Sequence, residues 1–285
     1  MKEKNYKKYD KDRKEREPGK DNRVKTGRQE QQPAKIHEDI IVGRNAVLEA
    51  LKTGRTINKL YVLDGARGGS MGEITMLAKQ AGSLIEFVPR EKLEDMSGGM
   101  RHQGVAAQVS PVAFHSLEEV LARAKAKQET PFLLLLDELQ DPQNVGALLR
   151  TADAAGVHGV LLPQRRSCPL NATVAKTSAG AIEYVPVVKI GNVSQTIEEL
   201  KQLGFWIVGA DMSGKETYFS ANLTGPIVVV VGAEGRGLTR LVKENCDVLV
   251  NIPMAGGVSS LNASVAGAIL IYEVVRQRMN KMCKN

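Results

Sequence analysis

The chain has 285 residues, of which 42% are apolar and only 4% aromatic, so its core must consist mainly of aliphatic side chains. This composition excludes a collagenous, coiled-coil or wholly disordered chain, and three cysteines are too few for a disulfide scaffold. The net charge is +7, but residues 1–36 hold 13 basic and 7 acidic side chains and therefore +6 of that charge. Residues 37–285 therefore carry a net charge of only +1, so their binding to an anion such as RNA cannot rest on net charge.

Residues 1–36 contain few large apolar side chains and many charged ones. Such a segment cannot bury enough surface to offset the entropy lost on ordering, so we expect a disordered basic tail. Two functions remain open for it, an arm that contacts RNA phosphates without reading sequence and a solubilising extension.

Targeting and cysteine patterns indicate a cytoplasmic protein. The amino-terminal segment lacks the apolar core of a secretory signal, and no run of about 18 uncharged apolar residues predicts a membrane span. Cys168, Cys246 and Cys283 are far apart in the sequence and form no CxxC pair. We therefore expect neither a zinc site nor a thiol relay, and a reducing compartment suits this cysteine usage.

At roughly 100–200 residues per domain, the length predicts about two domains after allowance for the tail. The first is a small α/β domain over residues 37–110, followed by a linker over 111–130 that contains an amphipathic helix at 117–127. Alternating helical and strand patterns predict five elements in the small domain: helices over 45–51 and 71–79, and strands over 60–63, 84–88 and 104–109.

The pattern changes in the second domain, residues 131–285. Runs that are apolar at every position predict strands over 132–136, 159–162, 184–188, 206–209, 227–231 and 248–252. Such runs indicate strands buried on both faces, as in a parallel sheet covered by helices. A final helix at about 260–279 is apolar around most of its surface, which predicts either deep burial or a subunit interface.

A glycine-rich loop at 232–237 follows the predicted strand at 227–231. Its glycines are spaced G-x-x-G-x-G, whereas a dinucleotide-binding turn needs G-x-G-x-x-G. Glycines still permit a close approach of the backbone to a ligand, and the carboxyl end of a buried strand is a usual binding position. Glu234 within this loop is a candidate functional residue, with solvated surface as the alternative.

A second loop, at 251–262, also follows a strand and precedes a helix. Ser259, Ser260 and Asn262 could each cap that helix, although a cap needs only one of them. Three short polar side chains beside free backbone N–H groups suit a polar ligand. The loop is not a phosphate-binding P-loop, because the lysine of that motif is missing.

The third candidate stretch begins at Asp141 and Pro142, which favour the start of a helix. Asn144 and Arg150 are six residues apart on that helix and therefore do not share a face. Arg150 has apolar neighbours in the sequence, so it either forms a buried salt bridge or has a functional partner.

These stretches, 144–150, 230–237 and 252–262, resemble in order and spacing the motifs of the SpoU (TrmH) branch of the SPOUT RNA methyltransferases. The resemblance covers about residues 131–278. Residues 38–110 resemble the L30-like substrate-binding domain of many such enzymes, chiefly at 43–47 and 102–105. The most similar subfamily is the bacterial 23S rRNA guanosine 2′-O-methyltransferases.

The resemblance implies a parallel-sheet α/β domain with a carboxyl-terminal trefoil knot, a feature otherwise nearly absent from proteins. It implies a homodimer with the final helix in the interface, S-adenosylmethionine as cofactor and no metal. The implied cofactor contacts are Gly232, Ala233, Gly235, Ile252, Met254, Ser259 and Leu261.

The implied reaction is methyl transfer to a ribose 2′-hydroxyl, with 23S rRNA as the expected partner. The expected catalytic residues are Asn144, Arg150, Glu234, Ser260 and Asn262. Arg150 would reach the site across the dimer, either to orient an RNA phosphate or to act as a base. An arginine pKa is ordinarily above about 12, which favours the first role.

We expect further RNA contacts from Arg44, Arg165 and Arg166. Two other functions are alternatives: 2′-O-methylation of tRNA, and RNA binding without catalysis by a degenerate second domain. The complete set of expected catalytic residues disfavours the latter. The separate first domain favours rRNA over tRNA by analogy, and a 2′-hydroxyl as acceptor favours RNA over DNA.

Overall fold

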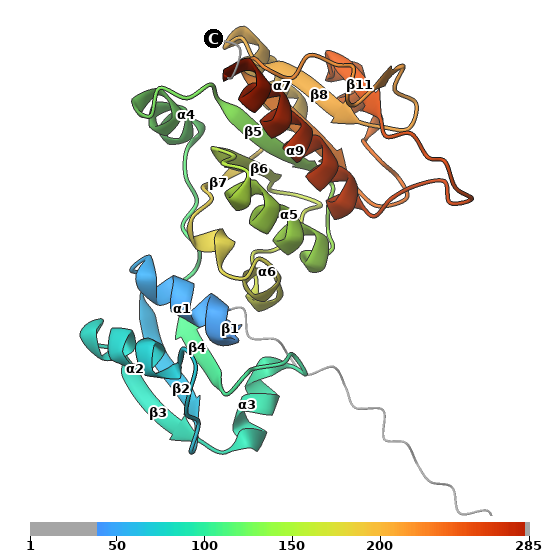
Figure 1. Cartoon of the computed structure of the whole chain (residues 1–285). Helices are drawn as coiled ribbons and strands as arrows, with labels where there is room; N and C mark the ends of the chain where they lie inside the picture. Colours follow the sequence, from blue (N-terminus) through green and yellow to red (C-terminus); the bar gives the residue numbers. More distant parts are fainter. Residues whose placement is uncertain (1–38, 283–285) are drawn as a thin grey trace, which may run out of the picture. The chain divides into compact units, whose positions relative to one another are not determined.

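A computed structural model describes residues 39–282 of the chain, which form two β-sheets with helices packed on them (Figure 1). The predicted basic tail at 1–36 lies outside the described residues. The first sheet has four strands in the order β1-β4-β2-β3, with β2 and β3 parallel and the β1–β4 and β2–β4 pairs antiparallel. Its strands are β1 (Ile40–Val42), β2 (Ile57–Leu63), β3 (Leu84–Val88) and β4 (Val105–Val109).

Helices cover both faces of this first sheet. The helices α1 (Arg44–Lys52) and α2 (Met71–Gln80) contribute to one buried cluster, whereas α3 (Arg90–Ser97) contributes Leu93 to another. All five predicted elements of this domain are confirmed, with ends that differ by a few residues. The sequence reading missed β1, which has only three residues, and α3, which buries only Leu93 and Ser97 and so has no helical apolar repeat.

The second sheet has seven strands, in the order β7-β6-β5-β10-β8-β11-β9, and every neighbouring pair is parallel. This confirms the predicted parallel sheet. The strands are β5 (Phe132–Asp137), β6 (Gly159–Pro163), β7 (Val187–Ile190), β8 (Trp206–Ala210), β9 (Glu216–Thr217), β10 (Ile227–Gly232) and β11 (Val248–Asn251).

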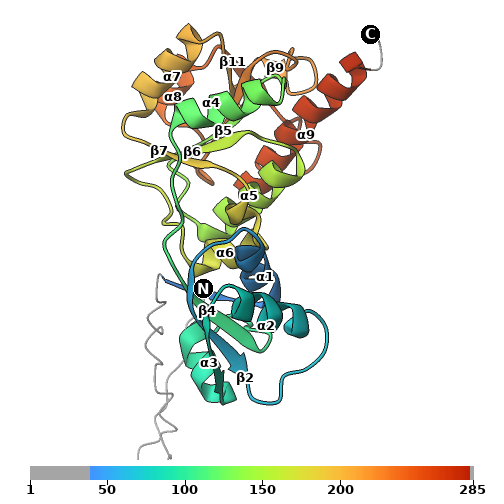
Figure 2. The same cartoon turned by 90° about the vertical axis from the view of Figure 1, so that its left-hand side faces the viewer.

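The central strands β5 and β10 are buried at every position because both of their faces are covered. On one face of the sheet, Leu134 of β5 and Val229 of β10 pack in a cluster with α5 (Pro142–Ala154) and α9 (Ala263–Met282). The residues on either side of each in the sequence point to the opposite face, where they pack in a separate cluster with α4 (Leu117–Ala126), α7 (Val193–Gln202) and α8 (Arg240–Asn245). Figure 2 shows α7 and α8 on one side of the sheet and α5 and α9 on the other.

The residues expected to link the domains include α4, whose Val120 is buried in the second of these clusters. Two further segments complete the helical part of the fold, α6 (Ala172–Thr177) and a 3-10 turn at Ala181–Glu183. The strand expected from residue 184 begins only at Val187. Pro186 immediately precedes it, and a proline cannot donate a ladder hydrogen bond.

The final helix begins at Ala263 rather than near residue 260, because Asn262 caps it. The Asn262 side-chain oxygen accepts hydrogen bonds from the backbone N–H groups of Ser264, at 3.0 Å, and Val265, at 3.3 Å. Neither Ser259 nor Ser260 takes this role. One face of α9 is buried, whereas Val265, Tyr272 and Met279 are 48%, 49% and 62% exposed. Deep burial of the whole helix is therefore ruled out.

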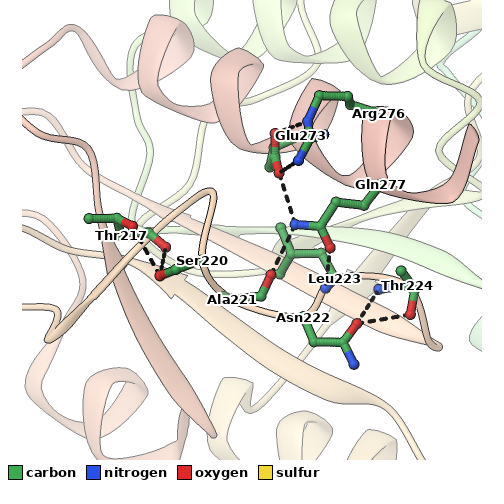
Figure 3. Close-up of polar contacts among 9 residues, drawn as sticks. All are labelled: Thr217, Ser220, Ala221, Asn222, Leu223, Thr224, Glu273, Arg276 and Gln277. Atoms are coloured by element: carbon green, nitrogen blue, oxygen red, sulfur yellow. Dashed lines mark hydrogen bonds and ion pairs between the residues drawn. The ribbon is translucent and has the colours of Figure 1, made fainter. Parts of the chain in front are cut away.

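Polar contacts fix α9 against the segment between β9 and β10 (Figure 3). The side-chain amide of Gln277 donates to the Ala221 carbonyl, and its oxygen accepts from Leu223 N, both at 2.9 Å. The same amide donates to Glu273, which also pairs with Arg276 at 2.6 Å. These bonds fix the orientation of α9, and with it the direction in which its exposed residues Val265, Tyr272 and Met279 point.

No helix within residues 39–282 is long and apolar enough to cross a membrane. The trefoil knot implied by the family resemblance stays a prediction.

Candidate functional site

A cavity of about 400 Å³ opens at the carboxyl ends of β8, β10 and β11. Parallel strands end at the same edge of the sheet, so the two loops that follow β10 and β11 meet there. The cavity is lined by nine of the ten residues that the sequence singled out in these loops, all except Asn262: Gly232, Ala233, Glu234, Gly235, Ile252, Met254, Ser259, Ser260 and Leu261.

The glycine loop after β10 folds back on itself. Gly237 N donates to the Ala233 carbonyl at 2.8 Å, and Gly235 between them has φ 76°, in the left-handed region that glycine favours. A Cβ on Gly232 would lie 2.5 Å from the backbone nitrogen of Leu238 and closer still to the carbonyl of Gly237. The wall of the cavity is therefore closely packed backbone, which only glycine at position 232 permits.

Three of the predicted catalytic residues meet at Glu234. Its Oε2 accepts hydrogen bonds from the side-chain amides of Asn144, at 3.3 Å, and Asn262, at 3.2 Å. Asn144 is only 4% exposed, on α5, whereas Glu234 and Asn262 are exposed in their loops. One carboxylate thus connects three segments beside the cavity, and a functional role for Glu234 stays a prediction.

The local sequence explains why Asn144 is buried there. The Asp141 carboxylate accepts a hydrogen bond from Gln143 N at 3.0 Å and caps α5, with Pro142 as its first residue. The helix therefore begins after a loop of four residues that follows β5, the strand next to β10, and its first turn places Asn144 against Glu234 of the glycine loop.

Arg150 lies on the exposed side of α5 and does not line the cavity of its own chain. Among residues 39–282, no acidic side chain lies within 4.0 Å of it. The buried salt bridge that the sequence left open is therefore excluded within this part of the chain. The structure keeps Arg150 apart from Asn144, as the spacing of six residues predicted.

The three arginines expected to contact RNA lie in two parts of the fold, with Arg44 half-buried in the small domain and Arg165 and Arg166 exposed in the second. Arg44 donates to the backbone carbonyls of Gln103, at 3.1 Å, and Gly68, at 2.9 Å. Arg166 pairs with Glu138 at 2.8 Å. Arg165 is exposed beside it, after β6. Contact with RNA stays a prediction for each of them.

The sequence reading missed several residues of the cavity, including Asp211, Met212, Arg236 and Lys243. Asp211 directly follows β8, and its side chain is only 7% exposed. The available signal was its position just after a buried strand. That position indicates a place beside the two motif loops only when β8 is known to lie between β10 and β11.

Two cysteines lie among residues 39–282, Cys168 buried and Cys246 half-buried. Burial raises the pKa of Cys168 to about 11 and that of Cys246 to about 12. Within residues 39–282 no group of three metal-ligating side chains occurs. The expectation that no metal takes part stays a prediction.

The sequence matches two family models. Residues 131–272 match the model described as the SpoU rRNA methylase family, and residues 40–115 match the model for RNA 2′-O ribose methyltransferase substrate binding. The chain belongs to the SpoU (TrmH) family of RNA methyltransferases. This confirms the resemblance inferred from the three motifs, and the small amino-terminal domain is the family's substrate-binding domain.

Relatives and solved structures agree with this assignment. YacO of Bacillus subtilis, named as a TrmH family tRNA/rRNA methyltransferase, is 47% identical over 240 residues, which are 84% of this chain and 96% of that protein. A Staphylococcus aureus relative with the same family name is 44% identical over 243 residues, which are 85% of this chain and 98% of that protein.

The fold is similar to that of the SpoU methyltransferase AviRb from Streptomyces viridochromogenes in complex with AdoMet, with a TM-score of 0.70 at 24% identity. The match covers 85% of this chain and 90% of AviRb. An RNA 2′-O ribose methyltransferase structure has a TM-score of 0.70 at 26% identity, covering 84% and 88% of the two chains. These similarities confirm the SPOUT methyltransferase fold.

The family uses S-adenosylmethionine, which confirms the expected cofactor. The cavity fits such a ligand, because its volume lies within the usual range for small-molecule sites and its walls combine close-packed backbone with the apolar side chains of Ile252, Met254 and Leu261. The seven predicted contacts all line this cavity, and their binding to the cofactor stays a prediction.

Proposed function

We propose that this RNA 2′-O-methyltransferase acts on a guanosine of 23S rRNA, as a cytoplasmic homodimer whose two chains share each site. The observation that carries the proposal is the Glu234 carboxylate bonded to both Asn144 and Asn262 at the edge of the cofactor cavity. These two hydrogen bonds can form only when α5, the glycine loop and the capping residue of α9 lie next to one another.

The difficult part of the reaction is the nucleophile. S-adenosylmethionine supplies an activated methyl group, but a ribose hydroxyl is barely ionised at neutral pH and must lose its proton during attack. Asn144, Glu234 and Asn262 hold one another in place and would orient the ribose next to the cavity. Ser260, which lines the same cavity, would add a hydrogen-bonding hydroxyl.

Arg150 would enter the site from the partner chain. It is exposed on α5, which packs against α9, and α9 presents the apolar stripe of Val265, Tyr272 and Met279. These three residues are spaced by seven, as in helices that pair along one seam. A second copy covering this stripe would bring another α5 with it, and the guanidinium would then orient a phosphate of the RNA.

This arrangement predicts a separation of catalysis from cofactor binding. Arg150→Ala should abolish methylation while the Kd for S-adenosylmethionine, measured by calorimetry, changes by no more than a few-fold. Mixing Arg150→Ala chains with Asn262→Ala chains should restore part of the activity, because one site of each heterodimer keeps both residues. No recovery in verified heterodimers would contradict the shared site.

The choice of rRNA rests on the substrate-binding domain at residues 40–115 and on the rRNA methylase family matched by residues 131–272. The name of the Bacillus subtilis relative covers tRNA and rRNA alike, so tRNA is the alternative target. The direct test uses 23S rRNA and tRNA from cells that lack the gene, with methyl-labelled cofactor. Label should enter 23S rRNA, and label in tRNA alone would contradict the proposal.

A further inference from the structure

The cofactor cavity contains a charged pair that belongs to none of the three sequence motifs. Asp211 and Lys243 both line it, and the Asp211 carboxylate is joined to the Lys243 ammonium at 2.7 Å. Asp211 directly follows β8, which lies between the two strands that lead into the motif loops. Its carboxylate is therefore placed between those loops, with only 7% of the side chain exposed.

Both oxygens of this carboxylate are held in position. Oδ1 accepts hydrogen bonds from the backbone N–H of Ser213, at 3.0 Å, and from its hydroxyl, at 2.6 Å, whereas Oδ2 accepts from Lys243. Burial alone raises the pKa of Asp211, but the hydrogen bonds from Lys243 and Ser213 outweigh it and keep the pKa below its usual value. The group is thus an oriented carboxylate.

One acceptor position of Asp211 remains for a ligand. An ionised carboxylate accepts about four hydrogen bonds, and the described residues supply three. The space beside Oδ2 is kept open by Gly237, where a Cβ would lie 3.2 Å from that oxygen. Gly237 also lines the cavity, so this opening faces the cofactor.

The cavity therefore has two carboxylates with different tasks. Glu234 is bonded to Asn144 and Asn262 on the side of α5 and β10. Asp211 lies on the side of β8, away from β5 and from the start of α5. A group bound by Asp211 is thus a part of the cofactor remote from the methyl-transfer cluster. The pairing with Lys243 leaves little net charge there, which suits a neutral hydroxyl better than an ammonium group.

We propose that Asp211 binds the cofactor by accepting a hydrogen bond from a ribose hydroxyl, and that Lys243 positions the carboxylate for this contact. Carboxylates at strand ends recognise ribose hydroxyls in the same chemical manner in dinucleotide sites. The proposal concerns the methyl donor alone and does not depend on which RNA is methylated.

Calorimetry on the full chain tests the proposal with two ligands, S-adenosylhomocysteine and 5′-methylthioadenosine. The second keeps the ribose and adenine but lacks the amino-acid part. Asp211→Asn should raise the Kd of both ligands by a similar factor of about ten or more, as expected for a hydrogen bond to a charged group. The exposed Asp95, in the substrate-binding domain, provides a matched control, and Asp95→Asn should leave both values unchanged.

Three outcomes would overturn the proposal. Unchanged affinity for both ligands in Asp211→Asn would exclude a cofactor contact, and a loss confined to S-adenosylhomocysteine would place the contact on the amino-acid part. Lys243→Met separates binding from structure, because it breaks the ion pair but keeps the carboxylate. It should weaken binding less than Asp211→Asn does. Equal losses, with equally lowered melting temperatures, would reduce Asp211 to a structural anchor.

Discussion

Replacing Gly232 by alanine should damage the proposed cofactor cavity through the backbone rather than through any lost contact. The new Cβ would lie 2.5 Å from Leu238 N and closer to the Gly237 carbonyl. These are backbone atoms, and a hydrogen bond of 2.8 Å from Gly237 N to the Ala233 carbonyl holds this part of the loop in place. No side-chain rotation can relieve the overlap, so the loop itself must move.

The expected cost follows from core overpacking, which typically destabilises by about 1–3 kcal/mol. For a chain of this size each kcal/mol lowers Tm by roughly 2–4 °C, so the melting temperature should fall by roughly 2–12 °C. The affinity for S-adenosylmethionine should fall as well, because the displaced loop forms a wall of the cavity. Thermal unfolding and calorimetry measure the two effects separately.

Gly256 in the second loop provides the matched control. A Cβ there would meet nothing within 4 Å, and the residue is exposed. Gly256→Ala should therefore leave both Tm and cofactor affinity close to those of the native chain. If Gly232→Ala behaved like Gly256→Ala in both measurements, the close-packed backbone loop would not be what shapes the cavity.

Three further predictions follow from charge and burial. The pKa of Glu273 is lowered by its bonds with Arg276 and Gln277, so its stabilising effect is present above the unfolded pKa of about 4.3 and is lost as pH falls. In urea titrations between pH 6 and pH 3, Glu273→Gln should accordingly lose less stability than the native chain. The raised pKa values of Cys168 and Cys246 predict slow alkylation by iodoacetamide at pH 8 in a Cys283→Ser chain, and fast alkylation in urea. Fast labelling of the native protein would contradict their burial. Deleting residues 1–36 removes a net charge of +6 and should flatten the salt dependence of RNA binding without changing the methylated nucleotide, which site mapping checks.

The strands of the second sheet could be predicted because strands that are buried on both faces are apolar at nearly every position in the sequence. The strand at 132–137 is apolar until Asp137, and all six of its positions are buried. The two motif loops were found for a related reason, since glycines and short polar residues directly follow such runs. Asn262 and Glu234 were thus identified before their hydrogen bond was known.

Asp211 could not be found in this way, because its importance depends on the order of the strands. The strand that it follows, β8, is fourth from last in sequence but lies between β10 and β11 in the sheet. Nothing in the local sequence fixes that neighbourhood. Arg150 presents the opposite case: the family motif marks it, but the structure of one chain leaves it exposed and outside the cavity.

The central claim is the methylation of a 23S rRNA guanosine, and mapping of 2′-O-methyl groups in cells tests it most directly. Ribosomal and transfer RNA would be compared with and without the gene, and after complementation with native or Arg150→Ala protein. One guanosine of 23S rRNA should lose its methyl group on deletion and regain it only with the native protein. Loss of a methyl group from tRNA alone, or no loss in any RNA, would contradict the account.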